Sequence, residues 1–73
     1  MDNRIAIIDY TEHGTSIYVK VEVFDAERST LFAEEVRFLD DLLYGDLLHP
    51  KRSPLTAECR QEASEYLRRY FGR

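Results

Sequence analysis

The side chains that could do chemistry in this 73-residue sequence are few and widely spaced. Its single cysteine, Cys59, and its two histidines, His13 and His49, lie far apart along the chain. A zinc site needs three or four such ligands at suitable spacing, and a nucleophilic cysteine needs a neighbouring base. We therefore expect no metal and no cofactor, with Cys59 in the core and both histidines in solvated loops.

Three carboxylates gather at Asp40, Asp41 and Asp46, where they could pair for acid–base work or hold a divalent cation. They lack the alternating oxygen donors and the terminal glutamate of a calcium loop. The sequence contains no glycine-rich phosphate loop and no serine elbow. A chain of this length also has difficulty enclosing a water-excluding pocket. We therefore predict that the protein is not an enzyme.

Charge is distributed unevenly along the chain, whose net charge is −4. Residues 1–49 carry eleven acids against four bases, a net charge of −7, and residues 50–73 carry six bases against three acids, a net charge of +3. Such an asymmetry can steer a charged partner toward one part of a protein. Each part therefore suggests its own kind of partner.

The leading hypothesis uses the acidic part. On the strand expected over residues 16–25, two aromatic side chains lie opposite the valine face, and aromatic residues are enriched in interface cores. This favours a non-enzymatic protein-binding module, an inhibitor or accessory regulator, that presents an acidic, aromatic surface to a basic, nucleic-acid-handling protein. Its candidate contact residues are Tyr18, Glu22, Phe24, Asp40, Asp41 and Asp46.

The alternative is a nucleic-acid-associated regulator that uses the basic C-terminal part. Its candidate residues are Lys51, Arg52, Arg68, Arg69 and Arg73. Arginines near a helix C-terminus also complement the helix dipole, which is a purely structural role. Because the whole protein is acidic, with a pI near 5.0, direct binding to nucleic acid is the less favoured interpretation.

Strict alternation gives the clearest secondary structure. Ile17, Val19, Val21 and Val23 recur with period two, which predicts a strand with one buried face over residues 16–25. The isoleucine-rich segment 4–10 predicts a second strand. Gly14 lies in the connection over residues 11–15 and can adopt positive φ, so the two strands should form an antiparallel hairpin.

Residues 30–44 are ambiguous. Phe32, Val36, Leu39 and Leu43 have the spacing of a helical stripe, but residues 30–38 also fit a strand. We favour the strand, because two strands alone are marginal and a third makes a viable sheet. Residues 39–45 should then form a short helical turn that ends at Gly45.

Two prolines in the connector, residues 46–54, oppose regular structure there. A helix is predicted over residues 55–71, capped by Ser53 or Thr56 and followed by Gly72. Its apolar stripe consists of Leu55, Cys59, Ala63, Tyr66, Leu67 and Tyr70. This stripe should pack on the valine face of the strand over residues 16–25.

The predicted fold is a single α+β domain over residues 1–73, with an antiparallel meander of two to three strands (residues 4–38) packed against the C-terminal helix. No apolar run is long enough to cross a membrane. A lone cysteine indicates a reducing compartment, so we expect the cytoplasm. So short a chain has little core, and aromatic residues on both faces of its best strand favour a homodimer.

Overall fold

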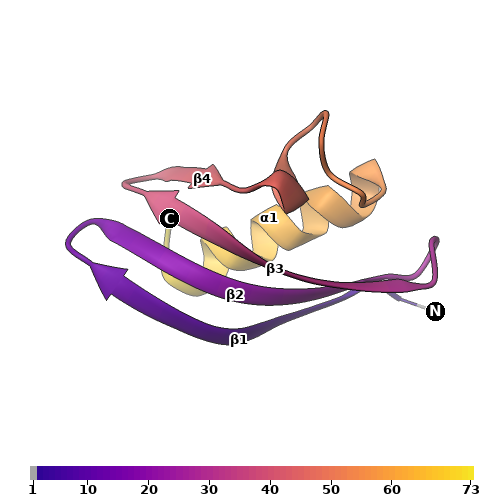
Figure 1. Cartoon of the computed structure of the whole chain (residues 1–73), viewed down its shortest axis with the longest axis horizontal. Helices are drawn as coiled ribbons and strands as arrows, with labels where there is room; N and C mark the ends of the chain where they lie inside the picture. Colours follow the sequence, from indigo (N-terminus) through magenta and orange to yellow (C-terminus); the bar gives the residue numbers. More distant parts are fainter. Residues whose placement is uncertain (1) are drawn as a thin grey trace.

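The computed structural model describes residues 2–73 and contains a four-stranded antiparallel sheet with one helix packed against it (Figure 1). The predicted α+β fold is confirmed, with one strand more than expected. The strands follow one another in sequence order across the sheet. In chain order the elements are β1 (Arg4–His13), β2 (Ser16–Asp25), β3 (Thr30–Leu39), β4 (Leu42–Tyr44), the short 3-10 helix η1 (Asp46–Leu48) and α1 (Ala57–Phe71).

The first hairpin is longer than the sequence suggested. β1 continues to His13, so the turn consists of Gly14 and Thr15 rather than the whole of residues 11–15, and Gly14 has the expected positive φ of 59°. The register with β2 shifts between Ile7 and Asp9, where Ile8 is the extra residue of a bulge. Thr11 and His13 extend β1 because each still pairs with a residue of β2, Thr11 with Tyr18 and His13 with Ser16.

The predicted helical turn over residues 39–45 is wrong. Asp40 has a φ of 55° and forms a tight turn with Asp41, after which β4 pairs with the end of β3. Leu43 lies opposite the buried Phe38 and is itself partly buried. The short run Leu42–Tyr44 therefore adds backbone hydrogen bonds and apolar burial at a sheet edge, which an isolated helical turn cannot provide.

The connector over residues 46–54 holds more regular structure than its prolines suggested. η1 forms just before Pro50 and places Leu47 fully inside the core. Gly45, which joins β4 to η1, has a φ of 150° and lies so close to β3 that a Cβ atom there would be 2.7 Å from Cγ1 of Val36. A side chain at this position would therefore clash with the core.

The predicted helix is confirmed, with a later start. Thr56 is its N-cap, and the side-chain oxygen of Thr56 accepts a hydrogen bond from the backbone N–H of Cys59. Ser53 instead donates a hydrogen bond to the carbonyl oxygen of Leu47 and so fastens the connector to η1. The helix ends at Gly72, which has the left-handed φ of 69° typical of a C-terminal glycine.

The core lies between the sheet and α1. As predicted, the four alternating side chains of β2 are buried together with Leu55, Cys59, Ala63 and Leu67. Val36, Phe38 and Leu47 complete the core. Tyr66 and Tyr70 do not belong to it: they are 39% and 56% exposed, and Phe71 packs against the core instead. The tyrosines lie one step outside the buried stripe of α1, where Tyr10 of β1 contacts Tyr70 edge-on.

Candidate protein-binding face

The sheet has one face covered by α1 and one face that no segment within residues 2–73 covers. In Figure 1 the helix passes behind β2 and β3, so the viewer looks at the uncovered face. Alternate residues of β1–β4 form this surface, which we call the open face. On β2 it carries Tyr18, Lys20, Glu22 and Phe24, whose neighbours in sequence are buried on the helix side.

One end of the open face is largely apolar. Phe24 lies directly opposite Arg4 on β1 and Leu31 on β3. The next row consists of Glu22 between two alanines, Ala6 and Ala33. These small side chains leave a hollow between β1 and β3, in which Leu31 is 56% exposed. Phe24 is only partly exposed, since the side chains beside it cover part of its ring.

The other end of the open face combines aromatic, cationic and aliphatic groups. Tyr18 lies opposite Arg37 of β3, which in turn lies opposite Tyr44 of β4. In the last row, Leu39 lies opposite Leu42, which is 58% exposed. Tyrosine and arginine are enriched at protein interfaces relative to the rest of the surface.

Charged groups occupy the middle of the open face. Lys20 lies between Asp9 on β1 and Glu35 on β3. The bulge at Ile8 places a further exposed apolar side chain beside this row, in a hollow that Lys20 and Glu35 also line. Over the whole open face three bases accompany three acids: Arg4, Lys20 and Arg37, with Asp9, Glu22 and Glu35. The face is therefore electrically balanced although the protein is acidic.

The predicted partner-binding residues are only partly brought together. Tyr18, Glu22 and Phe24 share the open face, but Tyr18 and Phe24 are six positions apart, a distance of about 20 Å along the strand. Asp40 and Asp41 lie in the β3–β4 turn at the Tyr18 end of the sheet. Asp46 lies in η1, where Arg52 approaches its carboxylate at 3.6 Å. Asp40 and Asp41 thus flank one end of the face, whereas Asp46 lies beyond β4, in a hollow that Arg37 and Tyr44 also line.

The predicted basic residues form two separate groups. Arg68 donates a hydrogen bond to the carbonyl oxygen of Asp41 at 2.9 Å, and Arg73 donates to those of Thr15 and Asp40 at 2.7 Å each. These two arginines therefore tie the end of α1 to the sheet turns. Lys51 and Arg52 precede the start of the helix, which is about 22 Å long. Arg69 is exposed between the tethering arginines.

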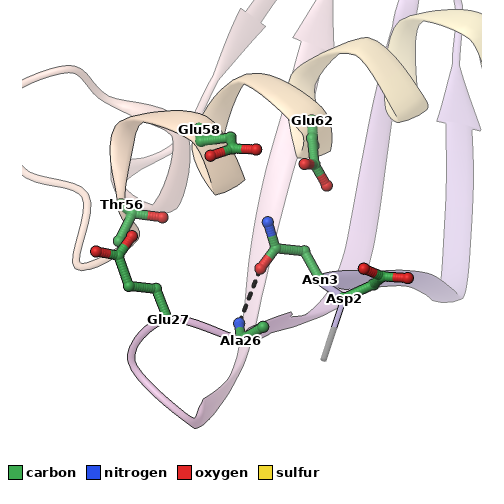
Figure 2. A pocket seen from close by; sticks show the side chains of 7 residues that line it. All are labelled: Asp2, Asn3, Ala26, Glu27, Thr56, Glu58 and Glu62. Carbon is green, nitrogen blue, oxygen red and sulfur yellow. Dashed lines mark hydrogen bonds between the residues drawn. The ribbon is translucent and has the colours of Figure 1, made fainter.

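An acidic hollow of about 410 Å³ lies beside the start of α1 (Figure 2). Glu58 and Glu62 project from the helix toward the N-terminal segment, whose Asn3 side chain accepts a hydrogen bond from the backbone N–H of Ala26 at 2.8 Å. Asp2 and Glu27 supply the other carboxylates. Over residues 2–73 no set of three or more histidine, cysteine, aspartate or glutamate side chains could hold a metal ion.

This hollow escaped the sequence analysis. Glu58 and Glu62 belong to the part of the chain with a net positive charge, so summing charges by sequence position hid them. The folded chain sets them beside acids from its other end. The helical spacing of the two glutamates could have indicated a shared helix face, but their neighbours depend on tertiary structure.

Two buried groups with reactive chemistry have structural roles. Asp25 is fully buried, and its carboxylate accepts hydrogen bonds from the backbone N–H groups of Thr56, Glu27 and Arg28 at 2.8, 3.1 and 3.2 Å. Cys59 is fully buried in the core, as predicted. Burial, with smaller contributions from nearby carboxylates, raises the pKa of the Cys59 thiol to about 11. The thiol is therefore protonated at neutral pH and is a poor nucleophile.

The sequence analysis did not name the contributions of β3 and β4 to the open face. Leu31 and Arg37 lie in the strand favoured over residues 30–38 but were not among the candidate contact residues, and Leu42 and Tyr44 were assigned to a helical turn. Leu31 and Arg37 lie on the open face because β3 pairs with β2, and Leu42 and Tyr44 do so because β4 is a strand that pairs with β3. The period-two pattern over residues 30–38 carried the signal for β3; the three residues of β4 are too few to show a period.

Comparison with protein-family models, with curated proteins and with solved structures found no match to this chain. Its function has to be argued from its own geometry. Within residues 2–73, α1 is too short and too polar to cross a membrane.

Proposed function

We propose that this chain is a non-enzymatic protein-binding module whose contact surface is the open face. The observation that supports this proposal is that no part of the chain between residues 2 and 73 covers one whole face of the sheet, although this face carries aromatic and aliphatic side chains at both ends. An antiparallel sheet with one solvated face normally alternates apolar residues inward with polar residues outward. Here the outward positions include Phe24, Leu31, Leu39 and Leu42.

The chemistry of the open face suits a protein partner. Leu31 and Leu42 would each remove well-exposed apolar surface from water, which is favourable by about 25 cal/mol for each Å² buried. Tyr18 and Arg37 lie side by side near one end, and both residue types are common among the side chains that dominate binding energies.

The expected preference for a basic partner would depend on the rim, because the open face itself is balanced in charge. Asp40 and Asp41 are exposed beside the Tyr18 end, so a basic segment that extends past this end would meet two carboxylates. Such rim charges mainly speed association. A role as an inhibitor or accessory regulator in the cytoplasm, where a lone buried cysteine stays reduced, fits this proposal.

Site-specific photo-crosslinking tests the proposal. A photoreactive phenylalanine analogue is placed at position 31 on the open face, at position 61 on the exposed side of α1 as a matched control, or at position 69 in the basic region. After irradiation in host lysate, the adducts are separated by mass and by sensitivity to protease and nuclease. We expect protein adducts, either with another protein or with a second copy, to form at position 31 well above the level at position 61.

Two outcomes would contradict the proposal. Equal protein adducts at positions 31 and 61 would mean that the open face is an ordinary solvated surface. Nuclease-sensitive adducts concentrated at position 69 would support the alternative, in which the basic residues Lys51, Arg52, Arg68, Arg69 and Arg73 bind nucleic acid. Circular dichroism of each labelled protein verifies that the analogue has not unfolded the chain.

A further inference from the structure

We infer that the partner that fits the open face is a second copy of this chain, packed face to face so that β2 of each copy lies over β3 of the other. This inference rests on the proposed function, since it names the occupant of the same face. The resulting dimer would be a β-sandwich with α1 on each outer side. Two sheets packed in this way keep their strands within about 30° of one another.

The sequence of side chains along the two central strands supports this arrangement. Consider a two-fold axis that runs along the strands, midway between β2 and β3. It exchanges the two strands, so each residue of β2 comes to face its own cross-strand neighbour in the partner subunit. Lys20 then faces Glu35, Phe24 faces Leu31, and Tyr18 faces Arg37. These three pairings are opposite charges, apolar groups and an arginine on an aromatic ring, and each is favourable. In the row between Lys20 and Phe24, Glu22 faces Ala33, a pairing without charge complementarity.

A perpendicular axis in the same plane gives a poor match. It reverses the direction of the strands, and when it passes through the centre of the face the central row meets the same row of the partner. Lys20 then faces Lys20 and Glu35 faces Glu35, which places like charges together at the middle of the interface. Like-charge contacts of this kind exclude wrong arrangements. The charge pattern therefore favours the axis that runs along the strands over a perpendicular axis through the central row.

Charge and area also suit association of two identical chains. Each chain has a net charge of −4, but the open face carries equal numbers of acids and bases, so the surfaces that meet do not repel. The molecule measures 36 by 23 Å in its two longer directions, the plane of Figure 1, which bounds the projected face at about 800 Å². A standard stable interface buries about 800 Å² on each partner, so such a dimer would have to use nearly the whole open face.

Charge exchange between two single variants tests the inference. Lys20→Glu gives a chain with two glutamates in the central row, and Glu35→Lys gives a chain with two lysines there. Neither variant should form a homodimer with itself, because like charges would meet twice across the two-fold axis. We expect the dissociation constant of each to rise roughly 100-fold above that of the wild type. An equimolar mixture should form a heterodimer, because each glutamate then meets a lysine.

The double variant Lys20→Glu/Glu35→Lys is the control for folding, because it reverses the charge pair both within each chain and between chains. It should dimerise like the wild type and melt only slightly lower, because the new carboxylate at position 20 lies opposite Asp9 of β1. Sedimentation velocity and native mass spectrometry measure all four samples, and circular dichroism verifies their folding. A heterodimer in the mixture together with monomeric single variants supports the arrangement.

The inference is overturned if the single variants dimerise as strongly as the wild type, if the folded variants fail to associate on mixing, or if the wild type itself is monomeric. The photo-crosslinking result separates this failure from failure of the proposed function. Adducts at position 31 with a different protein would leave the open face as a binding surface with another occupant. If protein adducts at position 31 do not exceed those at position 61, both the dimer and the proposed binding function are contradicted.

Discussion

Replacing Asp25 with alanine should cost about 3–5 kcal/mol of the free energy of unfolding, because its buried carboxylate is the shared acceptor for three backbone N–H groups. These donors belong to the β2–β3 turn and to the N-cap of α1, which are 31 residues apart at Asp25 and Thr56. A domain of this length has a total stability of about 4–11 kcal/mol. The variant should therefore lose a large share of its stability, and equilibrium urea unfolding would measure the loss.

Asp25→Asn separates the effect of charge from that of shape. Burial raises the pKa of the Asp25 carboxyl, but the hydrogen bonds from Thr56, Arg28 and Glu27 together hold that pKa below its ordinary value of 3.8. A group with a lowered pKa contributes stability above its unfolded pKa and loses it as the pH falls toward its folded pKa. The wild type should therefore lose stability below about pH 4, and the asparagine variant should lose less there. Equal acid sensitivity of the two proteins would contradict this role for the carboxylate.

Leu67→Ala should cost about 2–4 kcal/mol, since the side chain is fully buried between α1 and the sheet and its removal leaves a cavity. Val21→Ala should lower stability in the same way at the facing surface of β2. Leu31→Ala is the matched control, because that leucine is exposed on the open face of the monomer. At a concentration where the chain is monomeric, thermal melting should separate Leu67→Ala clearly from Leu31→Ala. Wild-type melting of Leu67→Ala would contradict the core assignment.

The sequence allowed most of the fold to be predicted because its longest elements have long periodic patterns. The alternation from Ile17 to Val23 defined β2 and its buried face, and the stripe from Cys59 to Leu67 defined the buried side of α1. β4 and η1 could not be predicted, because three-residue elements form through tertiary contacts that local preference does not encode. Leu43 opposite Phe38 is one such contact. Tyr66 was wrongly assigned to the core because its position borders the apolar stripe. A tyrosine can occupy either a buried or an exposed position there, since its ring is apolar and its hydroxyl is polar.

The candidate site was predictable only along one strand. Tyr18, Glu22 and Phe24 share a face because residues two apart always do in a strand. Which residues flank them depends on register: Arg37 lies beside Tyr18 because of the turn over residues 26–29. For the arginines that were candidates for binding nucleic acid, the sequence did not show that they have partners within the chain. Arg68 and Arg73 look free in the sequence, yet they bind carbonyl oxygens of turns that lie more than 25 residues away.

The mass of the unmodified chain in solution tests most directly whether the open face binds a second copy of the chain. Sedimentation equilibrium over a range from low to several hundred micromolar measures the chain without labels or substitutions. We predict a concentration-dependent approach to twice the monomer mass of 8.6 kDa, with no species beyond the dimer, because a two-fold axis closes the assembly. A constant mass of 8.6 kDa across that range would contradict the face-to-face dimer.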